Sequence, residues 1–274
     1  MEHRTKKTAK CGAPCDFQFA ICNLQYAILL LGLFLLSGCS RSMDPQLAQK
    51  FRAAQTEFDK AVKPDDFVKV ASMYQEIIDR GAVSGAVYYN QGNAWMKAMQ
   101  PGRAIAAYRM AQRYRPRDPY LEANLEYVLG PGYSGRRPVI ETVLFWQNWL
   151  SYPEKFYAVS AAAGLTFCFA TIALFVSQRR MWRRLVLAGA VITVLLMISA
   201  GYDWYRFDYV VHGVIIQADV VARKGNAESY EPAFNEKLSE GTEFRLVERR
   251  GDWLLIRLSG GQEGWIDNRA AITY

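Results

Sequence analysis

Three long uncharged runs of mostly apolar residues divide the chain, at residues 17–40, 156–178 and 185–202. A helix of about 20 apolar residues is long enough to cross a lipid bilayer. The second and third runs therefore predict transmembrane helices at 156–178 and 185–202. The segments 43–130 and 211–274 instead show the periodic mixing of polar and apolar residues that is typical of domains folding in water. We expect a multidomain membrane protein.

The first run has the design of an export signal. Four basic residues precede it: Arg4, Lys6, Lys7 and Lys10. A basic start followed by an apolar core is typical of a secretory signal. The ending Leu36-Ser37-Gly38-Cys39 resembles a bacterial lipobox, which implies a signal peptide at 1–39 and lipidation of Cys39. The alternative is an uncleaved anchor helix in which Cys39 has no role.

Charge predicts the orientation in the membrane. The loop expected at 179–184 contains four arginines and no acidic residue: Arg179, Arg180, Arg183 and Arg184. Basic loops stay in the cytoplasm, and the basic leader must do the same. Both signals put the two folded domains on the periplasmic side of the bacterial inner membrane. The linker 131–155 contains a segment rich in tryptophan, at 143–153, which either lies on the membrane surface or packs on the helical domain.

Residues 43–130 have a helical period with breaks near Pro64, Gly81 and Pro101. Within this segment one set of residues resembles the tetratricopeptide repeat in its spacing: Tyr88, Gly92, Trp95, Ala104, Tyr108, Ala111 and Pro116. The small residues of this set allow close helix packing, and its aromatic residues fill the space between helices. Gln91 departs from the leucine of the family pattern. We therefore expect an all-α helical-repeat domain, with a degenerate earlier repeat and a capping helix after Asp118.

The tetratricopeptide resemblance implies a peptide-binding groove. The residues that match groove positions are Tyr89, Asn93, Met96 and Asn124. Asparagines at such positions hydrogen-bond a peptide backbone in some family members. The alternative is that Asn93 and Asn124 stabilise the repeat itself.

The C-terminal segment 211–274 has short alternating strands separated by turn residues. The strands are expected at 214–216, 219–223, 243–248, 253–258 and 264–266. The order Gly241-Thr242, Gly251-Asp252-Trp253 and Gly264-Trp265-Ile266 resembles a bacterial SH3 domain, so we expect an all-β SH3-like barrel. Trp253 is the candidate for stacking on a ligand, with a core position as the alternative, and Trp265 is expected in the core.

The whole arrangement resembles the BatE-like proteins of bacterial aerotolerance operons. These combine a tetratricopeptide region, a two-helix membrane hairpin and an SH3-like tail. The resemblance implies partnership with von Willebrand A-type membrane proteins and a MoxR-type ATPase. We therefore expect a protein-binding scaffold. The alternative is a cell-wall module in which the SH3-like domain binds peptidoglycan.

Enzymatic chemistry finds little support in the sequence. The two histidines, His3 and His212, are far apart, and the cysteines lie in the leader or, for Cys168, in an apolar run. This excludes a metal site built from Cys and His, and no nucleophile–histidine–acid set or phosphate loop is present. We expect no enzyme activity, no metal and no cofactor. Much of the basic charge flanks the apolar runs, so we expect no nucleic-acid partner.

Overall fold

The structure is a computed structural model that describes residues 44–130, 146–176 and 179–274. The predicted signal peptide and Cys39 lie outside the described residues. The chain divides into two compact units. The hairpin unit contains Tyr157–Met197, and the larger unit contains Ser42–Phe156 together with Ile198–Tyr274.

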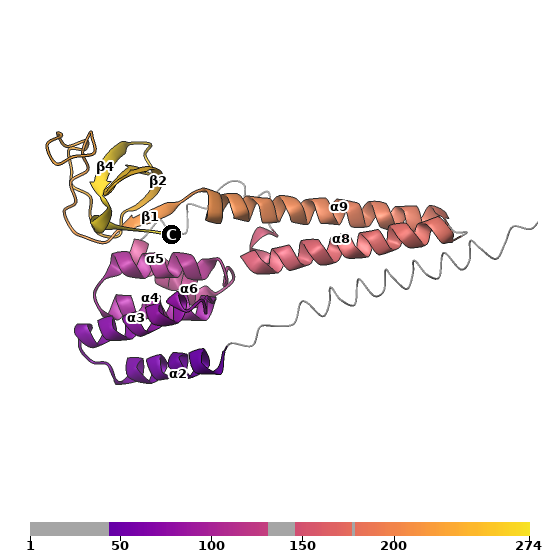
Figure 1. The fold of residues 1–274 in the computed structure, drawn as a ribbon, viewed down its shortest axis with the longest axis horizontal. Helices are drawn as coiled ribbons and strands as arrows, with labels where there is room; N and C mark the ends of the chain where they lie inside the picture. Colours follow the sequence, from indigo (N-terminus) through magenta and orange to yellow (C-terminus); the bar gives the residue numbers. More distant parts are fainter. Residues whose placement is uncertain (1–43, 131–145, 177–178) are drawn as a thin grey trace, which may run out of the picture. The chain divides into compact units, whose positions relative to one another are not determined.

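Five helices form the first half of the larger unit (Figure 1). They are α2 (Pro45–Lys60), α3 (Pro64–Asp79), α4 (Gly85–Lys97), α5 (Pro101–Gln112) and α6 (Pro119–Leu129). Four of them begin with proline, which is preorganised for the first helical position and lacks the N–H that would be unpaired there. Ser84 caps the remaining one, since its side chain accepts from the backbone N–H of Val87. Each helix packs on the next.

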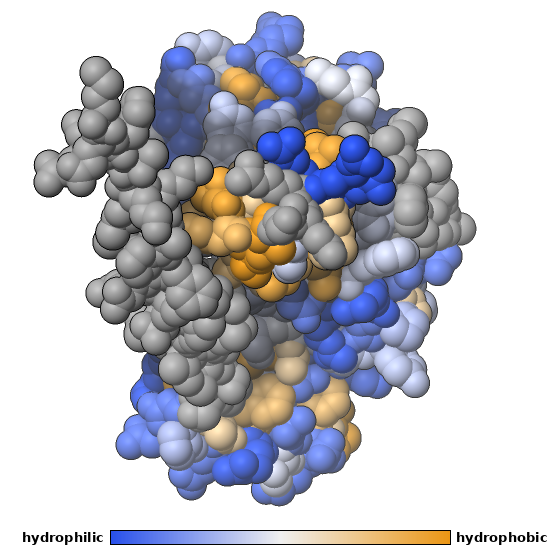
Figure 2. All heavy atoms as spheres, turned by 90° about the vertical axis from the view of Figure 1, so that its right-hand side faces the viewer, coloured by the Kyte–Doolittle hydropathy of each residue, from blue (hydrophilic) through white to orange (hydrophobic). Residues whose placement is uncertain are grey.

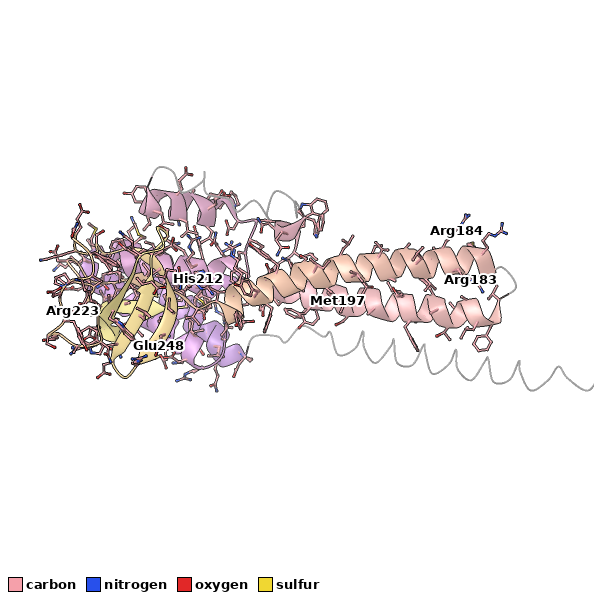
Figure 3. The ribbon with its side chains drawn as sticks, turned by 90° about the horizontal axis from the view of Figure 1, so that it is seen from above. Arg183, Arg184, Met197, His212, Arg223 and Glu248 are labelled. Atoms are coloured by element: carbon pink, nitrogen blue, oxygen red, sulfur yellow. The ribbon has the colours of Figure 1, made fainter. Side chains whose placement is uncertain are left out.

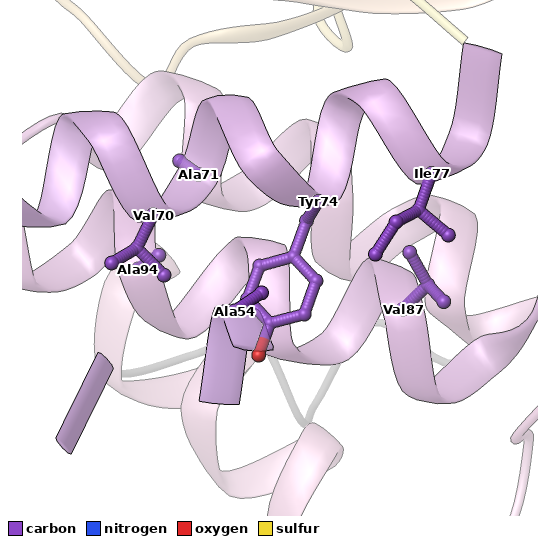
Figure 4. Close-up of a cluster of buried hydrophobic side chains, with 7 residues drawn as sticks. All are labelled: Ala54, Val70, Ala71, Tyr74, Ile77, Val87 and Ala94. Carbon is purple, nitrogen blue, oxygen red and sulfur yellow. The ribbon is translucent and has the colours of Figure 1, made fainter. Parts of the chain in front are cut away.

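The helical core combines small and aliphatic side chains with tyrosine rings. The cluster drawn in Figure 4 contains Ala54, Val70, Ala71, Tyr74, Ile77, Val87 and Ala94. A Cβ atom built on Gly92 would lie 2.4 Å from the ring of Tyr108, so the absence of a side chain at Gly92 makes room for that ring. Gln91, which departs from the repeat pattern, is buried, and its amide donates to the side-chain oxygen of Gln75 at 2.8 Å. The bond satisfies a polar group that would otherwise destabilise the core.

The C-terminal residues form a five-stranded antiparallel sheet with the order β4-β3-β2-β1-β5. The strands are β1 (His212–Ile215), β2 (Glu243–Arg250), β3 (Trp253–Arg257), β4 (Glu263–Asp267) and β5 (Ala271–Thr273). Four of them match predicted strands. The strand predicted at 219–223 is wrong: this segment makes isolated bridges, because Asp219 has a φ of 60° that breaks an extended conformation. The sequence pattern missed β5.

Helix α5 packs directly on the sheet. Ile105 and Ala106 of α5 share a buried cluster with Val214 of β1. A Cβ atom on Gly102 would lie 2.4 Å from the carbonyl oxygen of Ile215, so only glycine permits this approach. The backbone N–H of Gly102 also donates to the carboxylate of Glu240 at 3.0 Å. The helical region and the sheet, predicted as separate domains, therefore share a core.

The hairpin unit is built from α8 (Tyr152–Phe175) and α9 (Arg179–Trp204), whose outer ends extend into the larger unit. Both helices are long and apolar enough to cross a membrane, and their apolar stretches are largely unburied. The loop predicted at 179–184 is wrong, because α9 begins at Arg179; arginine is a good helix former. Arg183 and Arg184 lie at the end where the two helices meet (Figure 3). Figure 2, which faces this end, shows apolar side chains with hydrophilic ones beside them.

Candidate functional site

A hydrogen-bonded polar cluster joins α4, α5 and α6. The hydroxyl of Tyr108 donates to the side-chain oxygen of Asn93 at 2.8 Å, and the amide of Asn124 donates to the same oxygen at 3.0 Å. The Asn124 amide also lies 3.4 Å from the hydroxyls of Tyr89 and Tyr108. The structure thus brings together Tyr89, Asn93 and Asn124, three of the four predicted groove residues.

Tyr108 is the member of this polar cluster that sequence reasoning assigned to the fold alone. Its ring is buried against Gly92, and its hydroxyl emerges between Asn93 and Asn124. Burial raises the pKa of Tyr108, so the hydroxyl remains a protonated donor at neutral pH. The repeat spacing predicts that the ring of Tyr108 packs between two helices. It does not indicate which side chains the hydroxyl of Tyr108 contacts.

The cluster retains capacity for a ligand. A carboxamide can make about four hydrogen bonds. The Asn93 oxygen already accepts two, and among the described residues its amide nitrogen has no partner. Both asparagines are half-buried rather than sealed in the core. The arrangement can therefore offer preoriented amide groups to an extended peptide backbone while also stabilising the three helices.

Apolar and cationic groups surround the cluster. Met96 of α4 is half-buried and packs against the buried apolar cluster that contains the Tyr108 ring. The guanidinium of Arg115 lies 5.1 Å from the ring centroid of Tyr89, and Arg115 also pairs with Asp118 at 2.6 Å. A cation over an aromatic ring is attracted by the negative face of the ring, so this contact helps to hold Arg115 in place. Met96, the fourth predicted groove residue, therefore belongs to the same neighbourhood.

The residues predicted to build the repeat occupy the interior. Tyr88, Gly92, Ala104, Tyr108 and Ala111 are buried, whereas Trp95 is half-buried with Arg103 over its ring. Pro116 comes after the C-terminal end of α5, as expected. Apart from Tyr108, whose hydroxyl belongs to the polar cluster, these side chains position the cluster and do not line it.

The two tryptophans of the sheet differ in burial. Trp265 of β4 is buried, as expected, with the guanidinium of Arg250 5.4 Å from its ring centroid. Trp253 of β3 is half-buried and lies opposite Arg250 on one side and Asp267 on the other. Trp253 therefore keeps an accessible surface at the end of the strand.

A buried ion pair that the sequence did not predict joins the outer ends of α8 and α9. The ammonium of Lys155 lies 2.5 Å from a carboxylate oxygen of Asp203, and the side chains are 2% and 8% exposed. Gln147 donates to Asp203 at 2.5 Å and accepts from the hydroxyl of Ser199 at 2.7 Å. Gln147 belongs to the tryptophan-rich segment, in which Gln147 is buried and Trp149 is 60% exposed. In the sequence, Lys155 comes directly before the apolar run 156–178, and Asp203 comes directly after the run 185–202. These positions are the only sign of the pair that the sequence offers.

The described residues contain no group of three or more His, Cys, Asp and Glu side chains that could hold a metal ion. Comparisons with known proteins found no matching family model, no matching curated protein and no matching solved structure. The functional argument therefore depends on the residues and their contacts.

Proposed function

We propose that the chain is a non-enzymatic scaffold in the bacterial inner membrane that binds protein partners on its periplasmic side. In this proposal α2–α6 act as a tetratricopeptide-type domain and the sheet as an SH3-like domain. Lipidation of Cys39 would add a second anchor. The resemblance to BatE-like proteins supplies the partner class: von Willebrand A-type membrane proteins and a MoxR-type ATPase.

The observation that carries the binding proposal is the shared acceptor of the polar cluster. Tyr108 and Asn124 both donate to the side-chain oxygen of Asn93, which holds that carboxamide in one orientation. A preoriented amide loses little conformational entropy when it binds a peptide. Half-buried Met96 and the Tyr89 ring supply apolar contact next to it.

Support for the membrane placement comes from the hairpin unit. Its two helices are long and apolar enough to cross a bilayer. The arginines at the joined end have the charge bias of a cytoplasmic turn. The larger unit then lies on the periplasmic side, where a groove and a sheet can meet other envelope proteins.

Sidedness is tested with single-cysteine variants labelled by a membrane-impermeant maleimide in intact cells. The substitution Asn226→Cys is at an exposed position in the larger unit, and Met181→Cys is at an exposed position beside the arginines, which it leaves in place. We expect labelling at 226 before lysis and at 181 only after permeabilisation. The opposite pattern would contradict the proposed topology.

Partner binding is tested by in-cell crosslinking, gentle detergent solubilisation, affinity purification and mass spectrometry. We expect enrichment of A-type domain membrane proteins or a MoxR-type ATPase with the native chain. Asn93→Ala should reduce this enrichment. Lys97→Ala, at an exposed position on the same helix, should not. If Asn93→Ala and Lys97→Ala retain the partners equally, the polar cluster is excluded as the partner-binding site.

The alternative function is binding of peptidoglycan through the sheet. The observation that favours it is the accessible surface of Trp253, since half-exposed aromatic rings stack on apolar faces of ligands. Recovery of wall fragments without a protein partner, lost with Trp253→Ala, would support this alternative over the scaffold.

A further inference from the structure

A pocket of about 380 Å³ lies between α5, the segment after α9 and the sheet, all within the larger unit. Its volume falls in the range typical of small-molecule sites. Among the described residues that line it are five arginines: Arg109, Arg113, Arg206, Arg245 and Arg257. The same lining contains one carboxylate, that of Glu243. The pocket therefore has an excess of positive charge.

Strand register concentrates this charge on one row of the sheet. Arg245 of β2 lies directly opposite Arg257 of β3 and, on its other side, opposite His212 of β1. Like charges directly opposite each other destabilise a sheet. Burial lowers the pKa of His212, which therefore adds no charge at neutral pH. Figure 3 labels His212 at the start of the sheet.

Among the described residues, ion pairs compensate three of the lining arginines but leave Arg245 of the row without a counter-charge. Arg109 pairs with Glu243, Arg113 with Asp208 and Arg257 with Glu263. Within the part of the chain that the structure describes, Arg245 has no ion pair. An anion bound beside Arg245 and Arg257 would relieve their repulsion. Arginine guanidinium groups suit phosphate geometry, because they donate in a planar fork.

The position in the chain points to the source of the anion. Arg206 and Phe207 line the pocket and lie in the π-helix Tyr205–Tyr209 that directly follows α9. Arg206 comes four residues after Tyr202, the last residue of the apolar run, a rise of roughly 6 Å along a helix. The neighbouring Trp204, Tyr205 and Tyr209 are exposed aromatic residues, typical of a membrane interface. Apolar side chains of Met110, Phe207 and Leu258 also line the pocket.

We propose that this pocket binds the phosphate headgroup of an anionic lipid from the membrane that the chain spans. The inference depends on the membrane placement given above, but not on the identity of any protein partner. A lipid held between α5 and the sheet would bind the larger unit to the bilayer surface.

The test uses the full chain in detergent micelles doped with phosphatidylglycerol or phosphatidylcholine, with bound lipid counted by native mass spectrometry. The native chain should retain phosphatidylglycerol in preference to phosphatidylcholine. The double variant Arg245→Gln/Arg257→Gln should bind phosphatidylglycerol roughly thirtyfold more weakly. The control Arg249→Gln/Arg269→Gln should bind as the native chain does. It removes the same charge from two exposed positions outside the pocket, one on β2 and one in the 3-10 helix after β4, and Arg269, like Arg257, has a carboxylate partner.

Three results would overturn the proposal. Equal lipid retention by the two double variants would exclude Arg245 and Arg257 as the lipid-binding residues. Displacement of the lipid by millimolar inorganic phosphate would assign the pocket to free phosphate. Displacement by a short polyglutamate peptide would assign it to an acidic protein segment. Partner purification with Arg245→Gln/Arg257→Gln separates the two proposals, since lipid loss should leave the groove and its partners intact.

Discussion

The guanidinium of Arg109 in α5 donates to both carboxylate oxygens of Glu243 in β2, at nitrogen–oxygen distances of 2.7 and 2.8 Å. The side chains are only 17% and 30% exposed. Tyr274, the last residue of the sequence, donates to the same carboxylate at 2.9 Å. The carboxylate of Glu243 on β2 thus accepts hydrogen bonds from α5 and from Tyr274, and so links the helical region to the sheet.

Removal of this carboxylate should loosen the contact between helix and sheet. We expect Glu243→Ala to lower the free energy of unfolding by about 1–3 kcal/mol, between the values for exposed and fully buried pairs, because it leaves Arg109 without its bidentate partner. Glu248→Ala, which removes an exposed ion pair with Arg250 on the same strand, should cost under about 0.5 kcal/mol. The measurement is denaturant unfolding of the full chain in detergent. Equal losses would contradict a coupling role.

Acid should weaken the same contact. Burial alone would raise the pKa of Glu243, but the bonds with Arg109 and Tyr274 outweigh it and hold the pKa below the ordinary 4.5. A carboxyl with a lowered pKa in the folded state stabilises fully above its unfolded pKa. The contribution is lost as pH falls from 4.5 through the lower folded pKa. Hydrogen exchange of α5 and β1 as a function of pH checks this. In Glu243→Gln, the acid-induced increase in exchange should be absent. An exchange profile that is the same in the variant and the native chain would contradict the role of Glu243.

The buried pair at the outer ends of α8 and α9 gives a third prediction. Asp203→Asn removes the charge opposite Lys155, which is 2% exposed, and should destabilise by about 3–5 kcal/mol. The double variant Lys155→Met/Asp203→Leu should recover most of that loss, because apolar side chains need no partner there. Thermal stability in detergent is the readout. A double variant less stable than Asp203→Asn would show that the pair has a further role.

Close packing at Gly102 gives a fourth prediction. The Cβ of Gly102→Ala would meet backbone atoms of Ile215 and Ile216 at 2.4 and 3.0 Å, so α5 and β1 must separate. We expect a loss of about 1–3 kcal/mol, typical of overpacking. Gly260→Ala is the control, since nothing lies within 4 Å of its Cβ position. Hydrogen exchange in α5 and β1 should accelerate only in Gly102→Ala. An unchanged rate would show that the contact is loose in solution.

Local patterns predicted the elements better than their contacts. The breaks at Pro64, Gly81 and Pro101 preceded helices as expected, because proline and glycine act on the backbone locally. The segment 219–223 has the alternation of a strand, yet the positive φ of Asp219 makes it irregular. The short β5 contains too few residues to show a period.

The contacts that define the candidate sites depend on residues far apart in the sequence. Asn93 and Asn124 were predicted as groove residues from the tetratricopeptide resemblance, which did not indicate that the hydroxyl of Tyr108 lies within hydrogen-bond distance of both. Arg245 and Arg257 are twelve residues apart in the sequence, and only the strand register places them opposite each other. No pattern in one sequence indicates that α5 covers β1.

The central claim, that the polar cluster of α4, α5 and α6 binds a protein partner, is tested most directly by site-specific photocrosslinking in cells. A photoreactive residue replaces Met96, which packs against the apolar cluster that contains the Tyr108 ring, or Lys97, the next residue, which is exposed. The account predicts a crosslinked A-type domain membrane protein from position 96, little from position 97, and loss of the product when Asn93→Ala is added. Equal products from both positions, or none from position 96, would contradict it.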